Sequence, residues 1–477
     1  MNPSARHVVV IGNGMTGSRL ADEVARRDPG GERVRLTVIG DENGPAYNRV
    51  LLPGVLAGIY TPEDIRLPFP DGPAVTLRTG TAATALDTAR RRVTLDDGTA
   101  LDYDECVLAT GARAAFPPVD GVAAADGTPE PGVTALRDLA DCRRVMALAR
   151  PGAPVVVLGG GVLGLEAARA LTARGVRVSL VESSPWIMRR QIDRPAADIL
   201  ADRYTALGVA VHSWRVASRW ISGTGLELDD GRVLAGDALV VTAGVRGATD
   251  LARAAGLPVE HGVLVDDTLT TGDPRVHAIG DCAQHRGGGA GLVQPGWEQA
   301  AVLAGLLTGT APEARYTGAR PVTRLKAEGI DLTSLGDTEA DDTAETVTIA
   351  DPYGGRYAKL SVRDGRVAGA VLLGFPESAS TIAQLYDGGD PVPADRLALL
   401  LGRAAPGAHT PDTGGDPVVC RCNAVPRSAI EAAWLDGART RVDVAAATRA
   451  TTGCGGCVRD VDTLLTGWSG TTPAPVG

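Results

Sequence analysis

Short runs of consecutive apolar residues recur along the chain, and segments with helical periodicity follow several of them. Residues 7–11 form one such run and lead into a helical pattern from Met15 to about Arg27, while residues 155–158 lead into a pattern that ends near Arg174. Uninterrupted apolar runs of this length are typical of strands that are buried on both faces of a parallel sheet. The pattern therefore predicts an α/β fold built from strand–helix–strand units.

The first run is followed by a glycine-rich loop, Gly12-Asn13-Gly14-Met15-Thr16-Gly17. This is a G-x-G-x-x-G motif in its strand–turn–helix context, where the glycines let the backbone approach a pyrophosphate at the helix N-terminus. The next strand, at 34–39, is followed by Asp41, whose carboxylate can hold a ribose hydroxyl. We therefore expect a first dinucleotide site made by Gly12, Gly14, Met15, Gly17 and Asp41.

A second loop of the same kind follows the run at 155–158. It reads Gly159-Gly160-Gly161-Val162-Leu163-Gly164, and the strand after its helix ends in Glu182. Two complete units predict two bound dinucleotides, the second one held by Gly159, Gly161 and Gly164. Glu182 can hydrogen-bond a ribose 2′-hydroxyl and repels a 2′-phosphate, which favours NADH over NADPH. Arg189 and Arg190 lie close enough in the sequence to keep NADPH as the alternative.

Three further apolar strands end in small or acidic residues. They end at Thr110-Gly111, at Gly244 and at Gly280-Asp281. Ligands of open α/β sheets bind beyond the carboxyl ends of the strands, where these residues lie. We therefore expect all five residues to bind cofactors, with the Asp281 carboxylate on a polyol chain.

If the two dinucleotides carry a flavin and a nicotinamide ring, three charged residues are candidates for neighbours of these rings. Arg49 can stabilise an anionic reduced flavin, Glu166 can reach the nicotinamide, and Lys326 is one of only two lysines in the chain. The alternatives are a surface arginine for Arg49 and an exposed helix residue for Glu166. No residue is assigned as catalytic, because the redox chemistry belongs to the cofactors. Residues 43–60 contain no cysteine, which argues against thiol-based chemistry.

Four of the seven cysteines form a C-x-C…C-x-x-C pattern, made by Cys420, Cys422, Cys454 and Cys457. Two close-set pairs can converge on one point and supply four thiolates to a [2Fe-2S] cluster. Capping-box patterns at 428–431 and 440–443 predict two short helices between the pairs, and a helical hairpin would bring the pairs together. A structural zinc site is the alternative, and two disulfides are a further one.

Composition limits the cellular compartment and the classes of binding partner that we expect for this protein. The chain of 477 residues is 44% hydrophobic, enough for several domains, and its net charge of −10 argues against nucleic-acid binding. No stretch approaches the roughly eighteen apolar residues of a spanning helix, and the first ten residues lack the apolar core of a signal peptide. Scattered cysteines suit a reducing compartment. We expect a cytoplasmic protein without membrane insertion.

Five segments carry a resemblance to a known group, at 10–15, 46–50, 159–168, 325–331 and 452–457. From about residue 6 to 465 the chain resembles the N-terminal portion of the NADH-oxidising large subunit of bacterial assimilatory nitrite reductase. It is similarly close to electron-transfer subunits of assimilatory nitrate reductase. The last segment resembles bacterioferritin-associated ferredoxin, a [2Fe-2S] helical module. The resemblance implies a glutathione-reductase-like two-dinucleotide fold, FAD in the first site, NADH in the second, and the four cysteines of the C-terminal pattern as cluster ligands.

The resemblance and the composition together suggest a domain plan. We expect an FAD-binding domain in two parts, an NAD-binding domain, a small α+β domain, a linker, a [2Fe-2S] module and a flexible tail. These correspond to residues 1–115 and 246–312, 116–245, 313–402, 403–417, 418–468 and 469–477.

The expected function is electron transfer from NADH through FAD and the cluster to a separate protein. The nitrite-reducing relatives continue into a sirohaem and [4Fe-4S] half, whereas this sequence ends at Gly477 with three further, widely separated cysteines. We therefore expect a separate terminal reductase, of the assimilatory nitrate or nitrite type, as the partner. The alternatives are a ferredoxin or rubredoxin reductase that serves an oxygenase, and a redox or NADH sensor without turnover.

Overall fold

The structure is a computed structural model, and it describes residues 5–288, 291–320, 322–339, 343–403, 416–420, 423, 425–453 and 455–469. The chain divides into two compact units. Unit 1 comprises Met1–Leu51, Tyr60–Ala114 and Val245–Ala319, and unit 2 comprises Leu52–Ile59, Ala115–Gly244 and Arg320–Gly477. The segment Leu52–Ile59, which the domain plan assigns to the first FAD part, therefore groups with unit 2. It contains helix α2 (Leu52–Ala57), which packs against helices of unit 2.

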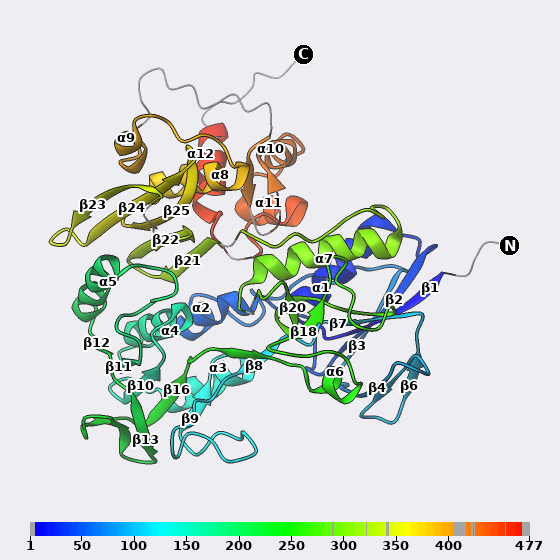
Figure 1. The fold of residues 1–477 in the computed structure, drawn as a ribbon, viewed down its shortest axis with the longest axis horizontal. Helices are drawn as coiled ribbons and strands as arrows, with labels where there is room; N and C mark the ends of the chain where they lie inside the picture. Colours follow the sequence, from blue (N-terminus) through cyan, green and yellow to red (C-terminus); the bar gives the residue numbers. More distant parts are fainter. Residues whose placement is uncertain are drawn as a thin grey trace. The chain divides into compact units, whose positions relative to one another are not determined.

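Unit 1 is organised around a parallel sheet with the strand order β19-β7-β1-β2-β3. Side chains alternate across β1, so that Val8 and Val10 pack in the core that contains residues of α1 and α7, while Val9 and Ile11 pack into a second core on the other face. Figure 1 shows α1 and α7 beside this sheet. Burial on both faces explains why β1 is a continuous apolar run. The bounds are β1 Arg6–Ile11, β2 Val34–Gly40, β3 Val75–Thr79, β7 Glu105–Leu108, β19 Val276–Ala278, α1 Met15–Arg27 and α7 Val293–Thr308.

Smaller elements complete unit 1. A three-stranded antiparallel sheet, β4-β5-β6, covers the second face of the parallel sheet, and β8 pairs with β17 while β18 pairs with β20. The bounds are β4 Ala83–Asp87, β5 Arg92–Leu95, β6 Ala100–Asp102, β8 Ala112–Ala114, β17 Val245–Gly247, β18 Val263–Val265, β20 Ala283–His285, α6 Asp250–Ala254, and the short 3-10 helices η1 Arg49–Leu51 and η2 Gly280–Cys282.

Unit 2 contains a second parallel sheet, with the order β12-β11-β10-β16-β9. One of its faces packs against the antiparallel strands β13-β14-β15 through a core that includes Val156, Leu239 and Trp220. The repetition of the sheet explains the repeated strand–loop–helix pattern in the sequence. The bounds are β9 Val133–Ala135, β10 Pro154–Leu158, β11 Arg177–Glu182, β12 Val209–Ser213, β13 Ala217–Ile221, β14 Gly225–Leu228, β15 Val233–Ala235, β16 Ala238–Val241, α3 Leu139–Leu148, α4 Val162–Ala173 and α5 Arg194–Ala206.

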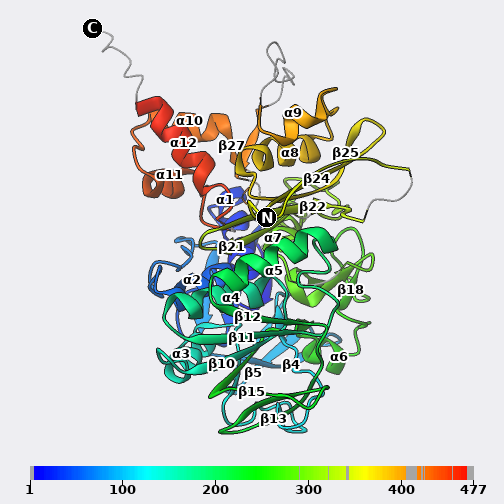
Figure 2. The ribbon, with the colours of Figure 1, turned by 90° about the vertical axis from the view of Figure 1, so that its left-hand side faces the viewer.

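The predicted small α+β domain is also part of unit 2. Its antiparallel sheet has the order β21-β22-β25-β24-β23, and α8 and α9 pack on it through Leu360, Ile382 and Leu400 (Figure 2). The bounds are β21 Val322–Ala327, β22 Ile330–Gly336, β23 Glu345–Asp351, β24 Arg356–Arg363, β25 Arg366–Leu373, α8 Pro376–Gly388 and α9 Arg396–Leu400.

The C-terminal module consists of β26 Val418–Cys420, β27 Val425–Pro426, α10 Arg427–Leu435, α11 Arg441–Thr448 and α12 Val458–Ser469. The capping box at Thr440 is confirmed, since Thr440 and Asp443 exchange side-chain to backbone hydrogen bonds. The capping box at Ser428 is wrong. The N-cap of α10 is Pro426, and Ser428 lies inside the helix with its backbone N–H donating to Asp416. Among the described residues, no helix is long and apolar enough to cross a membrane.

Candidate functional site

The first glycine loop joins β1 to α1 in unit 1, and its three glycines have different surroundings. A Cβ atom at Gly12, where φ is +118°, would lie 2.2 Å from the carbonyl oxygen of Ala109, and one at Gly17 would lie 1.9 Å from that of Gly12. Gly14, in contrast, has no atom within 4 Å of that position, and the start of α1 carries no side-chain cap. The outer glycines therefore permit close packing, while the middle one leaves space and backbone N–H groups for a phosphate.

The second loop repeats this arrangement between β10 and α4 in unit 2. A Cβ atom at Gly159, where φ is +117°, would lie 2.6 Å from the carbonyl oxygen of Thr242, and one at Gly164 would lie 1.9 Å from that of Gly159. Gly161 faces open space, and α4 also starts without a side-chain cap. Each unit thus has a cradle that a β-carbon would fill and that fits a dinucleotide pyrophosphate.

The other predicted residues of unit 1 lie at the carboxyl edge of the same sheet. Asp41 follows β2, Thr110-Gly111 follows β7, and Gly280-Asp281 follows β19. Since these strands are parallel, the structure brings Asp41, Thr110 and Gly280 to the edge where Gly12 begins the glycine loop. Met15 opens α1 there, and its carbonyl oxygen accepts a hydrogen bond from Nε1 of Trp297 at 3.0 Å.

Local hydrogen bonds hold this edge in place. The Thr110 hydroxyl donates to the carbonyl oxygen of Ala248 at 2.7 Å, and the Gly280 N–H donates to Oε1 of Gln299 at 2.7 Å. Asp281 Oδ1 accepts from the Gly291 N–H at 3.0 Å. These bonds position the backbone at the edge, while the Asp41 side chain is exposed to solvent.

Arg49 lies in η1 and forms an ion pair with Glu42. Its guanidinium lies 5.2 Å from the centre of the Tyr47 ring, and the Tyr47 hydroxyl donates to Glu42 Oε2 at 2.8 Å. Glu42, which the sequence analysis does not select, therefore fixes both neighbours. The structure thus gives Arg49 a defined position, and its predicted place beside a flavin stays a prediction.

Glu182 ends β11 beside the second loop. Its carboxylate accepts hydrogen bonds from the Gly160 N–H and from the Ser184 N–H, both at 2.6 Å. Arg189 lies with its guanidinium 4.8 Å from the centre of the Trp186 ring. Gly244, which follows β16 with φ of +105°, lies at the same carboxyl edge. The structure thus brings Glu182 and Gly244 to the cradle formed by Gly159 and Gly161.

Trp214 is a second residue at this edge that the sequence analysis does not select. It follows β12, its backbone N–H donates to the carbonyl oxygen of Ser184 at 3.0 Å, and the residue is 62% exposed. Its φ of +56° is an uncommon conformation for a residue with a Cβ atom. The sequence around Trp214 has no motif that predicts a position at this edge. The residue lies at the edge because β12, which precedes it, pairs with β11.

Glu166 and Lys326 form an ion pair within unit 2, in which the glutamate is buried and the lysine is partly exposed. Glu166 Oε1 accepts hydrogen bonds from the Lys326 N–H at 2.8 Å and from Nζ at 3.3 Å, and Glu166 is only 5% exposed. The alternative of an exposed helix residue is therefore wrong for Glu166. Burial raises the pKa of the Glu166 carboxyl, and the charge and hydrogen bonds of Lys326 offset part of this rise.

Cys106, Cys142 and Cys282 are fully buried. Burial raises the pKa of all three thiols, that of Cys142 to about 12. Protonated, buried thiols are poor nucleophiles.

The cysteine module places Cys420 at the end of β26 and Cys457 directly before α12, and both side chains are buried. Cys422 and Cys454 lie outside the described residues, so the convergence of all four thiolates stays a prediction. No disulfide joins two of the five described cysteines. Gly455 has a φ of +72°, and Arg324 on β21 donates to the carbonyl oxygen of Gly456. A buried cysteine at the end of β26 and another directly before α12 fit a thiolate-held cluster.

The described residues contain no group of three or more histidine, cysteine, aspartate or glutamate side chains placed to hold a metal. Asn423 is the further polar residue of this module that sequence reasoning misses. It is buried, and its amide nitrogen lies 3.7 Å from Cys420 Sγ. Its position directly after the C-x-C pair is the signal that would have found it.

Two parallel sheets, each with its own glycine cradle, define a protein that binds two dinucleotides. Residues 6–302 match the family described as pyridine nucleotide-disulphide oxidoreductase, and the chain belongs to this family. Residues 321–387 match the rubredoxin NAD+ reductase C-terminal domain, and residues 418–466 match the BFD-like [2Fe-2S] binding domain. The predicted fold class, FAD, the nicotinamide dinucleotide and the cluster are confirmed by these matches. The protein is an NAD(P)H-dependent flavoprotein oxidoreductase.

Individual relatives agree with the resemblance seen in the sequence. The chain is 32% identical over 470 residues to a nitrite reductase (NAD(P)H) of Bacillus subtilis, covering 96% of this chain and 57% of that protein. It is 32% identical over 478 residues to an assimilatory nitrate reductase electron transfer subunit of the same organism, covering 96% and 59%. The chain thus spans somewhat more than half the length of these relatives. Among solved structures, the covalent putidaredoxin reductase–putidaredoxin complex has a TM-score of 0.73 at 26% identity, over 83% of this chain and 96% of that one.

Proposed function

We propose that the protein passes electrons from NADH through FAD and a [2Fe-2S] cluster to a separate terminal reductase of assimilatory nitrate or nitrite reduction. The observation that carries the proposal is the presence of two dinucleotide cradles and a cluster-type cysteine module in one chain whose other three thiols are buried. A flavin held at the first cradle, by Gly12, Gly14 and Gly17, would supply the exchange between two-electron transfer from a nicotinamide and one-electron transfer to a cluster.

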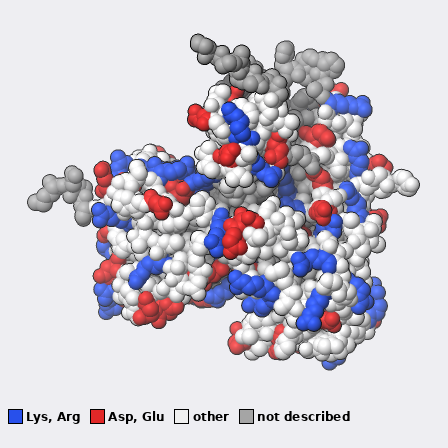
Figure 3. All heavy atoms as spheres, turned by 180° about the vertical axis from the view of Figure 1, so that it is seen from behind, with Lys and Arg blue, Asp and Glu red and all other residues white. Residues whose placement is uncertain are grey.

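Relatives support the choice of acceptor. The two Bacillus proteins carry nitrite and nitrate reductase in their names, and one of them is named as an electron transfer subunit. The net charge of −10 does not favour a nucleic acid or another polyanion as the partner. On the face seen in Figure 3, acidic and basic side chains are interspersed. We infer a cytoplasmic location, where NADH and a reducing environment are both available.

The preference for NADH follows from the second cradle. The Glu182 carboxylate lies at the loop, held by Gly160 and Ser184, where a 2′-phosphate would meet its negative charge. Arg189 stacks on Trp186 at 4.8 Å. Trp214 presents an exposed ring at the same edge and would stack on the adenine. In the proposed complex, Glu182 binds the ribose and Trp214 the base.

A second candidate function is electron donation to an oxygenase. It is favoured by the match of residues 321–387 to a rubredoxin reductase domain and by the similarity to putidaredoxin reductase. A sensor that binds NADH without turnover is a candidate of another class.

One experiment separates the three functions. The purified flavoprotein is given NADH or NADPH, first with ferricyanide, then with nitrate or nitrite reductase catalytic protein, and finally with rubredoxin or ferredoxin. The proposal expects rapid ferricyanide reduction with NADH and turnover of the nitrate or nitrite reductase. Turnover with rubredoxin or ferredoxin alone would favour the oxygenase function, and negligible oxidation of NADH would favour a sensor. Absence of an iron–sulfur signal after anaerobic reduction would favour zinc and contradict the proposal.

A further inference from the structure

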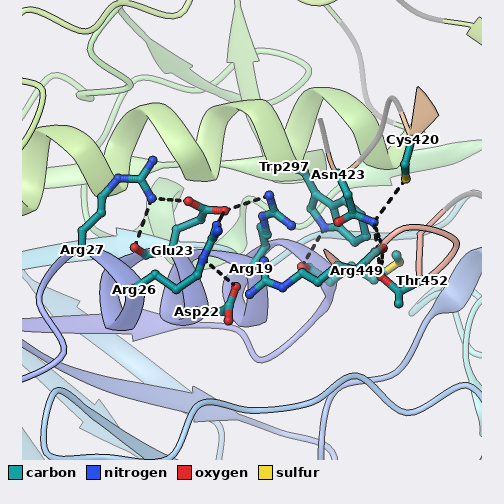
Figure 4. A network of polar contacts seen from close by, with 11 residues as sticks. Arg19, Asp22, Glu23, Arg26, Arg27, Trp297, Cys420, Asn423, Arg449 and Thr452 are labelled. Atoms are coloured by element: carbon teal, nitrogen blue, oxygen red, sulfur yellow. Dashed lines mark hydrogen bonds and ion pairs between the residues drawn. The ribbon is translucent and has the colours of Figure 1, made fainter. Parts of the chain in front are cut away.

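Asn423 connects the two cysteine-bearing loops of the C-terminal module. Its amide nitrogen donates to the carbonyl oxygen of Arg449 at 2.7 Å and to the Thr452 hydroxyl at 3.2 Å, and it lies 3.7 Å from Cys420 Sγ. Figure 4 shows Asn423 between Cys420 and the segment that contains Arg449 and Thr452. The residue is only 7% exposed, so water competes little for its hydrogen bonds.

The orientation of this amide is determined by its partners. A backbone carbonyl oxygen only accepts hydrogen bonds, so the short contact with Arg449 requires the NH₂ group of Asn423, and not its oxygen, on that side. The NH₂ group has two N–H groups for three acceptors, so at least one N–H is shared, and Cys420 Sγ is one of these acceptors. A thiolate is an acceptor, and a charge-assisted hydrogen bond to it is stronger than a bond between neutral groups.

The other side of the contact is a turn in an uncommon conformation. Arg449 ends α11 with a φ of +65°, and Thr451 has a φ of +72°. The Thr452 hydroxyl and N–H both donate to the carbonyl oxygen of Arg449, at 2.9 and 3.2 Å. Asn423 thus binds a tightly hydrogen-bonded turn that ends two residues before Cys454, and it links this turn to the Cys420 loop.

We propose that Asn423 is a positioning residue that holds Cys420 and the turn at Arg449–Thr452 in register and raises the reduction potential of the cluster by hydrogen-bonding the Cys420 thiolate. Reduction adds one negative charge to a cluster and its thiolates, so a donor at sulfur stabilises the reduced form more than the oxidised form. The inference rests on the proposed function only in requiring that the module holds a [2Fe-2S] cluster. It names the residue that sets how readily the cluster takes an electron.

The test compares Asn423→Leu with Thr452→Val in the full-length flavoprotein. Leucine has a similar volume and no donor, whereas Thr452→Val loosens the same turn and leaves the Asn423 N–H groups in place. Anaerobic redox titration followed by EPR gives the midpoint potential of the cluster in each variant. At the wild-type midpoint we expect the reduced-to-oxidised ratio to fall about tenfold in Asn423→Leu, which is 59 mV for one electron. We expect no such fall in Thr452→Val, and the flavin potential of both variants serves as an internal control.

The outcomes are distinguishable. Equal cluster potentials in wild type and Asn423→Leu, or equal shifts in Asn423→Leu and Thr452→Val, would overturn the inference and leave the proposed function intact. If Asn423→Leu loses iron while Thr452→Val keeps it, the positioning role is supported. In that case Asn423→Ser, whose hydroxyl can donate one hydrogen bond, is used instead, and its cluster potential is expected to fall by less than the 59 mV expected for the loss of the amide. A wild-type protein without a cluster signal would overturn both the inference and the proposed function.

Discussion

Replacement of Lys326 by methionine tests the ion pair that it forms with the buried Glu166. The ammonium group lies 3.3 Å from Glu166 Oε1, so at an effective permittivity of about 20 the attraction amounts to roughly 5 kcal/mol. Removal of one partner of a fully buried pair costs ~3–5 kcal/mol. The Lys326 side chain is 31% exposed, and its backbone N–H still donates to Glu166, so we expect a loss of about 2 kcal/mol in the free energy of unfolding.

The loss must depend on pH in a defined direction. Burial raises the folded-state pKa of Glu166 above its unfolded value, and Lys326 opposes this rise. A raised pKa contributes stability that is fully present below the unfolded pKa and is lost as the pH rises through the folded pKa. Without Lys326 the folded pKa rises further, so the deficit of Lys326→Met relative to wild type is expected to grow between about pH 5 and about pH 8.

Urea unfolding of the purified flavoprotein, followed by tryptophan fluorescence at both pH values, measures this deficit. Glu166→Gln is the matched control, because glutamine keeps the shape and cannot ionise. In the double variant Glu166→Gln with Lys326→Met, we expect a smaller loss than in Lys326→Met alone, and little dependence on pH. A deficit that is equal at both pH values, or that Glu166→Gln fails to reduce, would refute the electrostatic account of this pair.

Three further predictions concern the other described sites. Glu23 in α1 is 2% exposed and ion-pairs with Arg19 and Arg26 (Figure 4). Burial alone would raise the pKa of Glu23, but the neighbouring arginines lower it. Glu23→Gln is therefore expected to reduce the free energy of unfolding in urea by about 2 kcal/mol near neutral pH, and by progressively less as the pH falls through the lowered pKa. Trp214→Ala should raise KM for NADH by roughly threefold to tenfold with little change in kcat, in line with the ~0.5–1.5 kcal/mol of an aromatic stacking contact, and an unchanged KM in steady-state assays would contradict adenine stacking. Cys457→Ser should abolish the EPR signal of the reduced cluster and leave anaerobic flavin reduction by NADH intact, whereas the buried control Cys142→Ala should retain the signal.

Local patterns in the sequence predict the parts of the site that depend on local geometry. The positions of Gly12 and Gly159 follow from strand–loop–helix spacing, because only glycine accepts a positive φ with a carbonyl oxygen so close to the Cβ position. Glu182 is likewise found from its place at a strand end. In contrast, the S-x-x-E pattern at Ser428 does not mark the start of α10, because Pro426 provides the extended N-cap residue and Ser428 binds Asp416 instead.

Contacts between residues far apart in the sequence carry no such local signal. Arg324 and Lys326 are two positions apart on β21, so their side chains lie on the same face of the strand. Arg324 donates to Gly456 in the loop that precedes Cys457, 132 residues away, and Lys326 binds Glu166 on the helix after the second glycine loop, 160 residues away. No periodicity in β21 encodes these partners, since they depend on how the small α+β domain packs within unit 2. Lys326 stands out in the sequence because the chain is rich in arginine, whereas only the structure identifies Glu166 as its partner.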